Sequence, residues 1–88
     1  MAEIQFDVIT APVREDEDTV LYAAHLNSLP FMAGASMQAL SKLGAGKDGR
    51  DMCDKVDPAH ERARAIIQAK FDREGSTGRS CYISEMDV

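Results

Sequence analysis

Several residue types that often stabilise small proteins are scarce in this chain. It has no tryptophan, three phenylalanines, two tyrosines and only two cysteines. Two cysteines allow at most one disulfide, and neither Cys53 nor Cys81 stands in a CxxC pair or at the spacing of Cys/His zinc ligands. We therefore expect two reduced thiols, with Cys81 facing the core from a strand, and neither a metal nor another cofactor.

Long apolar runs are also missing. No stretch approaches the roughly 20 apolar residues of a membrane-spanning helix, and the opening residues Met-Ala-Glu-Ile-Gln-Phe resemble no signal peptide. These absences predict a protein without a membrane partner in the cytoplasm, or in the host cytoplasm if a phage encodes it. The chain has 88 residues, which leaves room for a single small domain, 1–88.

Basic residues are outnumbered. The chain has 10 Lys and Arg against 15 Asp and Glu, for a net charge of −5 and an isoelectric point near 4.8. Proteins that bind nucleic acid through its phosphates are usually basic, so direct binding to nucleic acid is not expected.

The residue patterns at both ends of the chain predict strands. Ile4, Phe6 and Val8 alternate with polar residues, and the last nine residues, 80–88, also alternate. Two strands at opposite termini pair most simply with each other, so we expect a short antiparallel pair.

The segments between these ends predict three helices. Residues 19–29 are apolar almost all round the helical wheel, and residues 31–43 carry an apolar arc about 200° wide. A third helix begins with Asp57 as its cap and Pro58 at its first position, and it runs to Glu74. The predicted fold class is therefore α+β and helix-rich, with three helices packed on the terminal strand pair.

The run Glu15-Asp16-Glu17-Asp18 has two interpretations. Carboxylates in the first turn of a helix stabilise the positive end of its dipole, and four carboxylates in a row can also bind a basic partner.

The apolar surface of the predicted helices exceeds what one small core covers, and no motif identifies a family or an active site. We therefore expect a non-enzymatic interaction protein, an inhibitor or regulator that sterically blocks a larger protein or a nucleic-acid-handling complex. Its composition is comparable to that of small phage proteins that disable host or defence machinery. The residues predicted to bind the partner are Glu15, Asp16, Glu17, Asp18, Tyr22, Phe31, Met32, Met37 and Leu40.

The same surplus of apolar surface predicts self-association. A twofold dimer through Met32, Ala33, Met37 and Leu40 would cover the wide arc of residues 31–43. The competing arrangement is a monomer that keeps this face for its target.

Two other functions stay open. The glycine-rich loop after residue 43 lacks the spacing of a phosphate-binding P-loop, but Lys47, Arg50 and Arg62 could hold an anion such as a nucleotide in a small oligomeric module. A small nuclease or hydrolase would depend on His60, although no nucleophile or acid is evident beside it.

Overall fold

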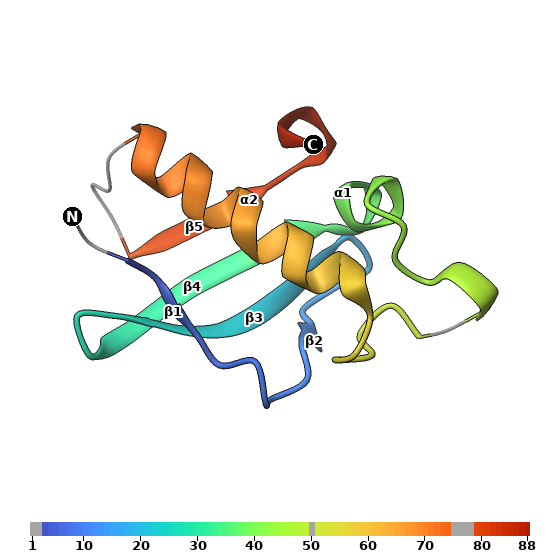
Figure 1. The fold of residues 1–88 in the computed structure, drawn as a ribbon, viewed down its shortest axis with the longest axis horizontal. Helices are drawn as coiled ribbons and strands as arrows, with labels where there is room; N and C mark the ends of the chain where they lie inside the picture. The colour runs from blue at the N-terminus through green and yellow to red at the C-terminus, as the bar shows by residue number, and fades with distance from the viewer. Residues whose placement is uncertain (1–2, 50, 75–78) are drawn as a thin grey trace.

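The computed structural model describes residues 3–49, 51–74 and 79–88 and shows a mixed sheet with one long helix across it (Figure 1). The strands are β1 (Gln5–Phe6), β2 (Val13–Arg14), β3 (Thr19–Leu26), β4 (Leu29–Ser36) and β5 (Ser80–Ile83). The helices are α1 (Met37–Lys42) and α2 (Pro58–Glu74), with two 3₁₀ turns at Lys47–Gly49 and Glu85–Asp87.

The strand order is β1-β3-β4-β5, and β2 also pairs with β3. Both short strands are antiparallel to β3, with Gln5 opposite His25 and Val13 opposite Leu21, so residues 7–12 loop out of one broken edge strand. β3 and β4 form a hairpin, and β5 is parallel to β4.

The predicted helix-rich fold is wrong, beginning with residues 19–29. The buried residues of this segment alternate (Val20, Tyr22, Ala24 and Leu26), which is the period of a strand. The exposed Ala23 between them hides that alternation from a hydrophobicity pattern. Asn27 and Ser28 both have positive φ, at 53° and 66°, and form the turn into β4.

The predicted helix at 31–43 is wrong over its first half. Residues up to Ser36 belong to β4, and only Met37–Lys42 is helical. Ser36 caps the start of α1, since its side-chain oxygen accepts the backbone N–H of Ala39 at 3.1 Å.

Pro30 is accommodated in β4 because its nitrogen points away from β3, toward the side on which β5 lies. β5 pairs with β4 only from Met32 onward, so the missing N–H of Pro30 costs no hydrogen bond of the sheet.

The predicted pairing of the terminal strands is also wrong. β5 lies beside β4, with Met32 opposite Ser80, and the last residues form a 3₁₀ turn rather than a longer strand. A parallel pair needs a crossover connection, which α2 supplies.

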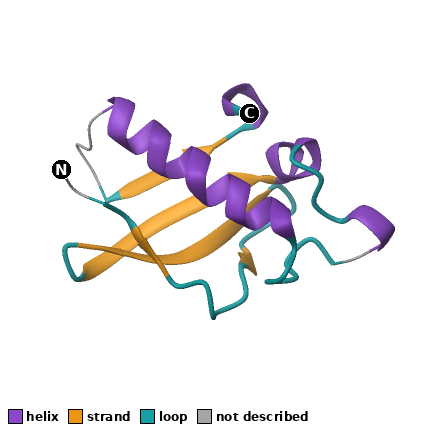
Figure 2. Ribbon diagram, in the orientation of Figure 1, coloured by secondary structure: helices purple, strands orange, loops and turns teal. Residues whose placement is uncertain are grey.

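The third predicted helix is confirmed as α2. Its first turn is capped by Asp57, whose carboxylate accepts the backbone N–H of Ala59 at 3.0 Å. The helix buries one stripe against the sheet (Ala59, His60, Ala63, Ile67 and Phe71), and the ring of Phe71 meets Phe31 of β4 edge to face. Figure 2 shows this helix lying along one face of the strands. No helix in the described residues is long and apolar enough to cross a membrane.

Candidate protein-interaction site

The sheet has a second face, which points away from α2. Side chains alternate along a strand, so the residues between the buried ones of β3 and β4 belong to this face. We call it the open face; its residues are Gln5, Val13, Thr19, Leu21, Ala23, His25, Pro30, Met32, Gly34, Ser36, Ser80 and Tyr82. Val13 is 60% exposed, Met32 47% and Tyr82 39%, so large apolar side chains contact solvent here.

The open face is hollowed into a groove of about 390 Å³. Val13 and Leu21 line one part of it, Ala23 and Met32 another, and Thr10 and Ala11 of the loop between β1 and β2 contribute as well. The small side chain of Ala23 leaves space between its larger neighbours. A groove of this size admits a few side chains of another molecule.

The tyrosine at the edge of this face is fixed by a glycine. A Cβ atom on Gly34 would lie 2.8 Å from the Tyr82 ring and 2.9 Å from the carbonyl oxygen of Val20. The absence of a side chain at Gly34 therefore lets the ring lie directly on β4. Tyr82 extends the apolar surface across three neighbouring strands.

Beside the open face, the turn between β2 and β3 carries the acidic run. We call residues 15–18 the acidic turn. One carboxylate oxygen of Asp16 accepts the backbone N–H groups of Asp18 and Thr19, at 2.7 and 2.9 Å, so Asp16 builds the turn. Arg14 donates to the backbone carbonyls of Asp16 and Glu17 rather than to a carboxylate.

The remaining acidic side chains of the turn face solvent. Both ion pairs found in the described part of the chain, Lys70–Asp87 and Arg73–Glu74, involve other residues. The backbone N–H of Met37 donates to Asp18 at 2.7 Å, and that of Glu15 donates to Thr19 at 2.9 Å. The turn is thus anchored while its carboxylates stay exposed.

The structure separates the residues predicted to bind a partner into two groups. Tyr22, Phe31 and Leu40 lie in the core, and Met37 is half-buried against it. Met32 of β4 is exposed, and so is the acidic turn, which connects β2 to β3. The predicted set is therefore not one surface.

Most of the open face was not predicted from the sequence. Val13, Leu21, Ala23 and Tyr82 were not among the predicted site residues. The available signal was the alternation within 19–26, which puts Leu21, Ala23 and His25 on one side once the segment is assigned to a strand.

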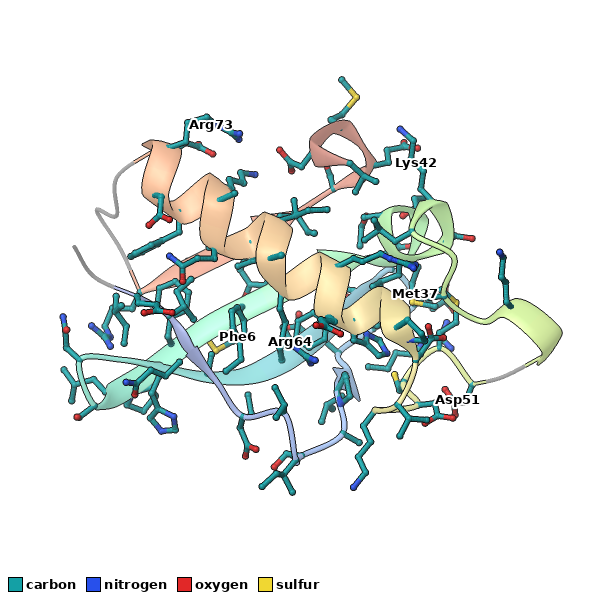
Figure 3. All side chains as sticks on the ribbon, in the orientation of Figure 1. Phe6, Met37, Lys42, Asp51, Arg64 and Arg73 are labelled. Carbon is teal, nitrogen blue, oxygen red and sulfur yellow. The ribbon has the colours of Figure 1, made fainter. Side chains whose placement is uncertain are left out.

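Tyr22 and His60 form a buried polar pair between sheet and helix. The Tyr22 hydroxyl lies 2.7 Å from His60 Nδ1, and His60 is 0% exposed. Among the described residues, no group hydrogen-bonds to His60 Nε2. Phe6 contacts the Tyr22 ring edge-on, and the Arg64 guanidinium lies 5.7 Å from its centroid; Figure 3 labels both residues.

Burial controls the protonation of this pair. It raises the pKa of Tyr22 and lowers the pKa of His60, so both side chains are neutral near pH 7. Since neither is open to solvent, the arrangement supports the core rather than contact with a substrate.

The residues predicted to hold an anion are only partly placed. Lys47 and Arg62 are exposed, and both approach Gly44, while the Arg62 guanidinium donates to the Leu43 carbonyl at 3.0 Å. Arg50 lies outside the described residues.

Both thiols are free and half-buried, and burial raises the pKa of Cys53 and of Cys81. The Cys81 sulfur lies 3.6 Å from the Ile67 carbonyl of α2, so this side chain faces the core. Within the ranges that the structure describes, no three His, Cys, Asp or Glu side chains gather into a metal site.

Comparisons with known proteins do not add to this geometry. No protein-family model matches the chain, and no curated protein or solved structure matches it either.

Proposed function

We propose that this protein is a non-enzymatic interaction protein, an inhibitor or regulator in the cytoplasm that binds a larger protein through its open face. The observation that carries the proposal is the apolar groove beside the anchored acidic turn. Such a protein acts by covering part of its target, and this requires shape, a buried anchor and complementary charge.

The composition of the open face supports binding. When one face of an antiparallel hairpin is solvated, its residues are usually polar. Here Val13, Leu21, Met32 and Tyr82 occupy the middle of that face, and its polar residues lie at the ends of the strands, although the opposite face already supplies the core. A contiguous exposed apolar patch next to charged residues is typical of an interaction site.

A homodimer through Met32, Ala33, Met37 and Leu40 has less support. Ala33 is 1% exposed and Leu40 0%, and of the four only Met32 is classed as exposed, at 47%. The acidic turn likewise favours a protein partner over nucleic acid, whose phosphates it would repel.

Affinity capture from lysate of the source organism tests the proposal when two variants are compared. Met32→Asp places a charge beside the groove, whereas Met86→Asp places one at an 89%-exposed position of the C-terminal 3₁₀ turn. We expect proteins captured by the wild type and by Met86→Asp to be lost with Met32→Asp. Equal capture by all three would overturn the assignment to the open face.

A further inference from the structure

Acidic groups outnumber basic ones at the end of the open face nearest the acidic turn, where four acidic residues accompany the one guanidinium of Arg14 that donates to the turn's backbone carbonyls. None of the described strand residues of the open face is Lys or Arg. Glu15 lies on the same side as Val13, because it is two residues further along the strand and its N–H pairs with Thr19. A molecule that covers the groove therefore meets carboxylates at the end nearest the acidic turn.

A second copy of the chain fits this face poorly. Each copy brings a net charge of −5 and its own acidic turn. β3 and β4 are eight residues long. At about 3.3 Å per residue and about 4.8 Å between strands, the open face offers on the order of 400 Å² per copy. Stable protein interfaces bury about 1,200–2,000 Å² in total, so any partner confined to this face forms a small interface. Charge repulsion then counts against a second copy in particular, because each copy adds an acidic turn.

A basic partner is attracted electrostatically by the acidic turn, whereas a second copy of the chain is repelled by it. Lys or Arg side chains next to an apolar anchor would meet Glu15, Glu17 and Asp18, which have no ion pair among the described residues. The backbone that carries these carboxylates is already fixed by the hydrogen bonds of Glu15, Asp16 and Asp18, so little ordering of the main chain is needed when a cation binds.

The distance between the groove and the acidic turn indicates which secondary structure the bound segment of the partner has. Val13 lines the groove, and the tip of the acidic turn is about three residues, or roughly 10 Å, beyond it. Seven residues of an α-helix rise about 10.5 Å. The open face presents side chains rather than free backbone groups, so it suits a helix face better than an added strand.

We infer that the partner presents an amphipathic, basic helix, with an aliphatic side chain in the groove and Lys or Arg about two turns away at the acidic turn. This inference rests on the proposed function and specifies the chemistry of the partner at the same site.

Synthetic helical peptides test it directly on the full chain. The probe has leucine on one face and lysine on the other, and its counterpart has glutamate in place of lysine. We expect the leucine/lysine peptide to bind in a fluorescence anisotropy titration at low salt and the leucine/glutamate peptide not to bind. Screening at about 1 M salt, where charges act over about 3 Å, should weaken binding at least tenfold.

Matched variants separate this site from general attraction to an acidic protein. The acidic-turn variant Glu15→Gln/Glu17→Gln/Asp18→Asn keeps Asp16, which builds the turn. The control Glu61→Gln/Glu74→Gln/Glu85→Gln removes equal charge from exposed positions outside the open face. We expect at least tenfold weaker binding for the first and less than twofold change for the second. Met32→Asp, or Val13→Asp if that variant fails to fold, should also weaken binding at least tenfold.

Several outcomes would overturn the inference. Equal weakening by both triple variants would show non-specific attraction, and equal binding of both peptides would exclude a charge requirement. Sedimentation equilibrium that shows a dimer broken by Met32→Asp would identify a second copy as the occupant. If neither peptide binds while capture from lysate still depends on Met32, the basic helix is excluded and the proposed function stands.

Discussion

At the scale of single residues, the Tyr22–His60 pair shows how closely a small core depends on one hydrogen bond. The Tyr22 hydroxyl is 2.7 Å from Nδ1, while Nε2 has no hydrogen-bond partner among the described residues. The pair links the middle of β3 to the first turn of α2.

We expect Tyr22→Phe to lower the free energy of unfolding by about 1–3 kcal/mol. The substitution keeps the ring but removes the hydrogen-bond partner of Nδ1 in a fully buried histidine. Urea unfolding followed by circular dichroism measures the loss. The control is Tyr82→Phe, at an exposed position, which should change stability by less than about 0.5 kcal/mol. Equal effects of the two changes would contradict this account.

Protonation of His60 should make stability depend on pH. Burial lowers its pKa in the folded state below the ordinary value of 6.5, so the unfolded chain binds a proton that the folded chain resists. Stability is therefore complete above about pH 6.5 and falls as the pH drops below that value. Urea midpoints measured between pH 7.5 and 5.5, an interval of about 2 units around this pKa, follow the loss.

Two variants test the assignment to His60. His60→Leu should be less stable near pH 7 but lose most of the slope in this interval. His25→Gln, at an exposed position, should keep the wild-type slope. A slope that survives His60→Leu would assign the dependence to other groups.

At the scale of elements, the hairpin of β3 and β4 determines the site and was the part predicted least well. Alanine and leucine favour helices intrinsically, and pairing with a neighbouring strand overrides that preference. The pairing cannot be read from one segment alone. α2, by contrast, carries a cap, a first-turn proline and an apolar stripe within its own sequence, and it was predicted at its observed bounds.

A substitution in the turn of this hairpin should increase the stability of the fold. Ser28 has φ of 66°, a left-handed conformation that glycine adopts without strain. Arg79 donates to the carbonyls of Leu26, Leu29 and Pro30, which keeps the turn in place. We expect Ser28→Gly to raise the free energy of unfolding by about 0.5 kcal/mol, because relief of strain exceeds the added freedom of the unfolded chain. Thermal unfolding measures it; a lower Tm would contradict the reasoning, and Ser28→Val should be destabilising.

At the scale of the whole molecule, two parts of the candidate site could be predicted from the sequence, but not how they are arranged in space. The acidic run and Met32 were predicted to contact a partner, and both are exposed, with Met32 opposite Ala23 and the acidic run next to Thr19 at one end of β3. The groove depends on β2, β3 and β4 being neighbours, which requires the tertiary fold. Tyr22, Phe31 and Leu40 were predicted to be partner contacts because the expected helices carried more apolar surface than one small core covers. In the structure all three belong to the core.

The acidic turn also bears on the stability of the whole chain. A protein with net charge −5 repels itself electrostatically, and four neighbouring acidic residues concentrate that repulsion. Residues retained for binding commonly lower stability. We therefore expect Glu15→Gln/Glu17→Gln/Asp18→Asn to stabilise the fold by about 0.5–1 kcal/mol at low salt, which corresponds to a Tm increase of about 2–8 °C for a domain of this size. Differential scanning calorimetry at low and high salt measures it, and the gain should shrink at high salt because screening already reduces the repulsion.

The companion variant Asp16→Ala should act in the opposite direction, because it removes the acceptor for the N–H groups of Asp18 and Thr19. If the triple variant were instead less stable than the wild type, the carboxylates of Glu15, Glu17 and Asp18 would contribute to folding. Their contribution to folding would then explain why these residues are acidic, without a binding partner. A stabilised triple variant that also loses its affinity for the leucine/lysine peptide would separate the two roles, with Asp16 shaping the turn and its three neighbours serving recognition.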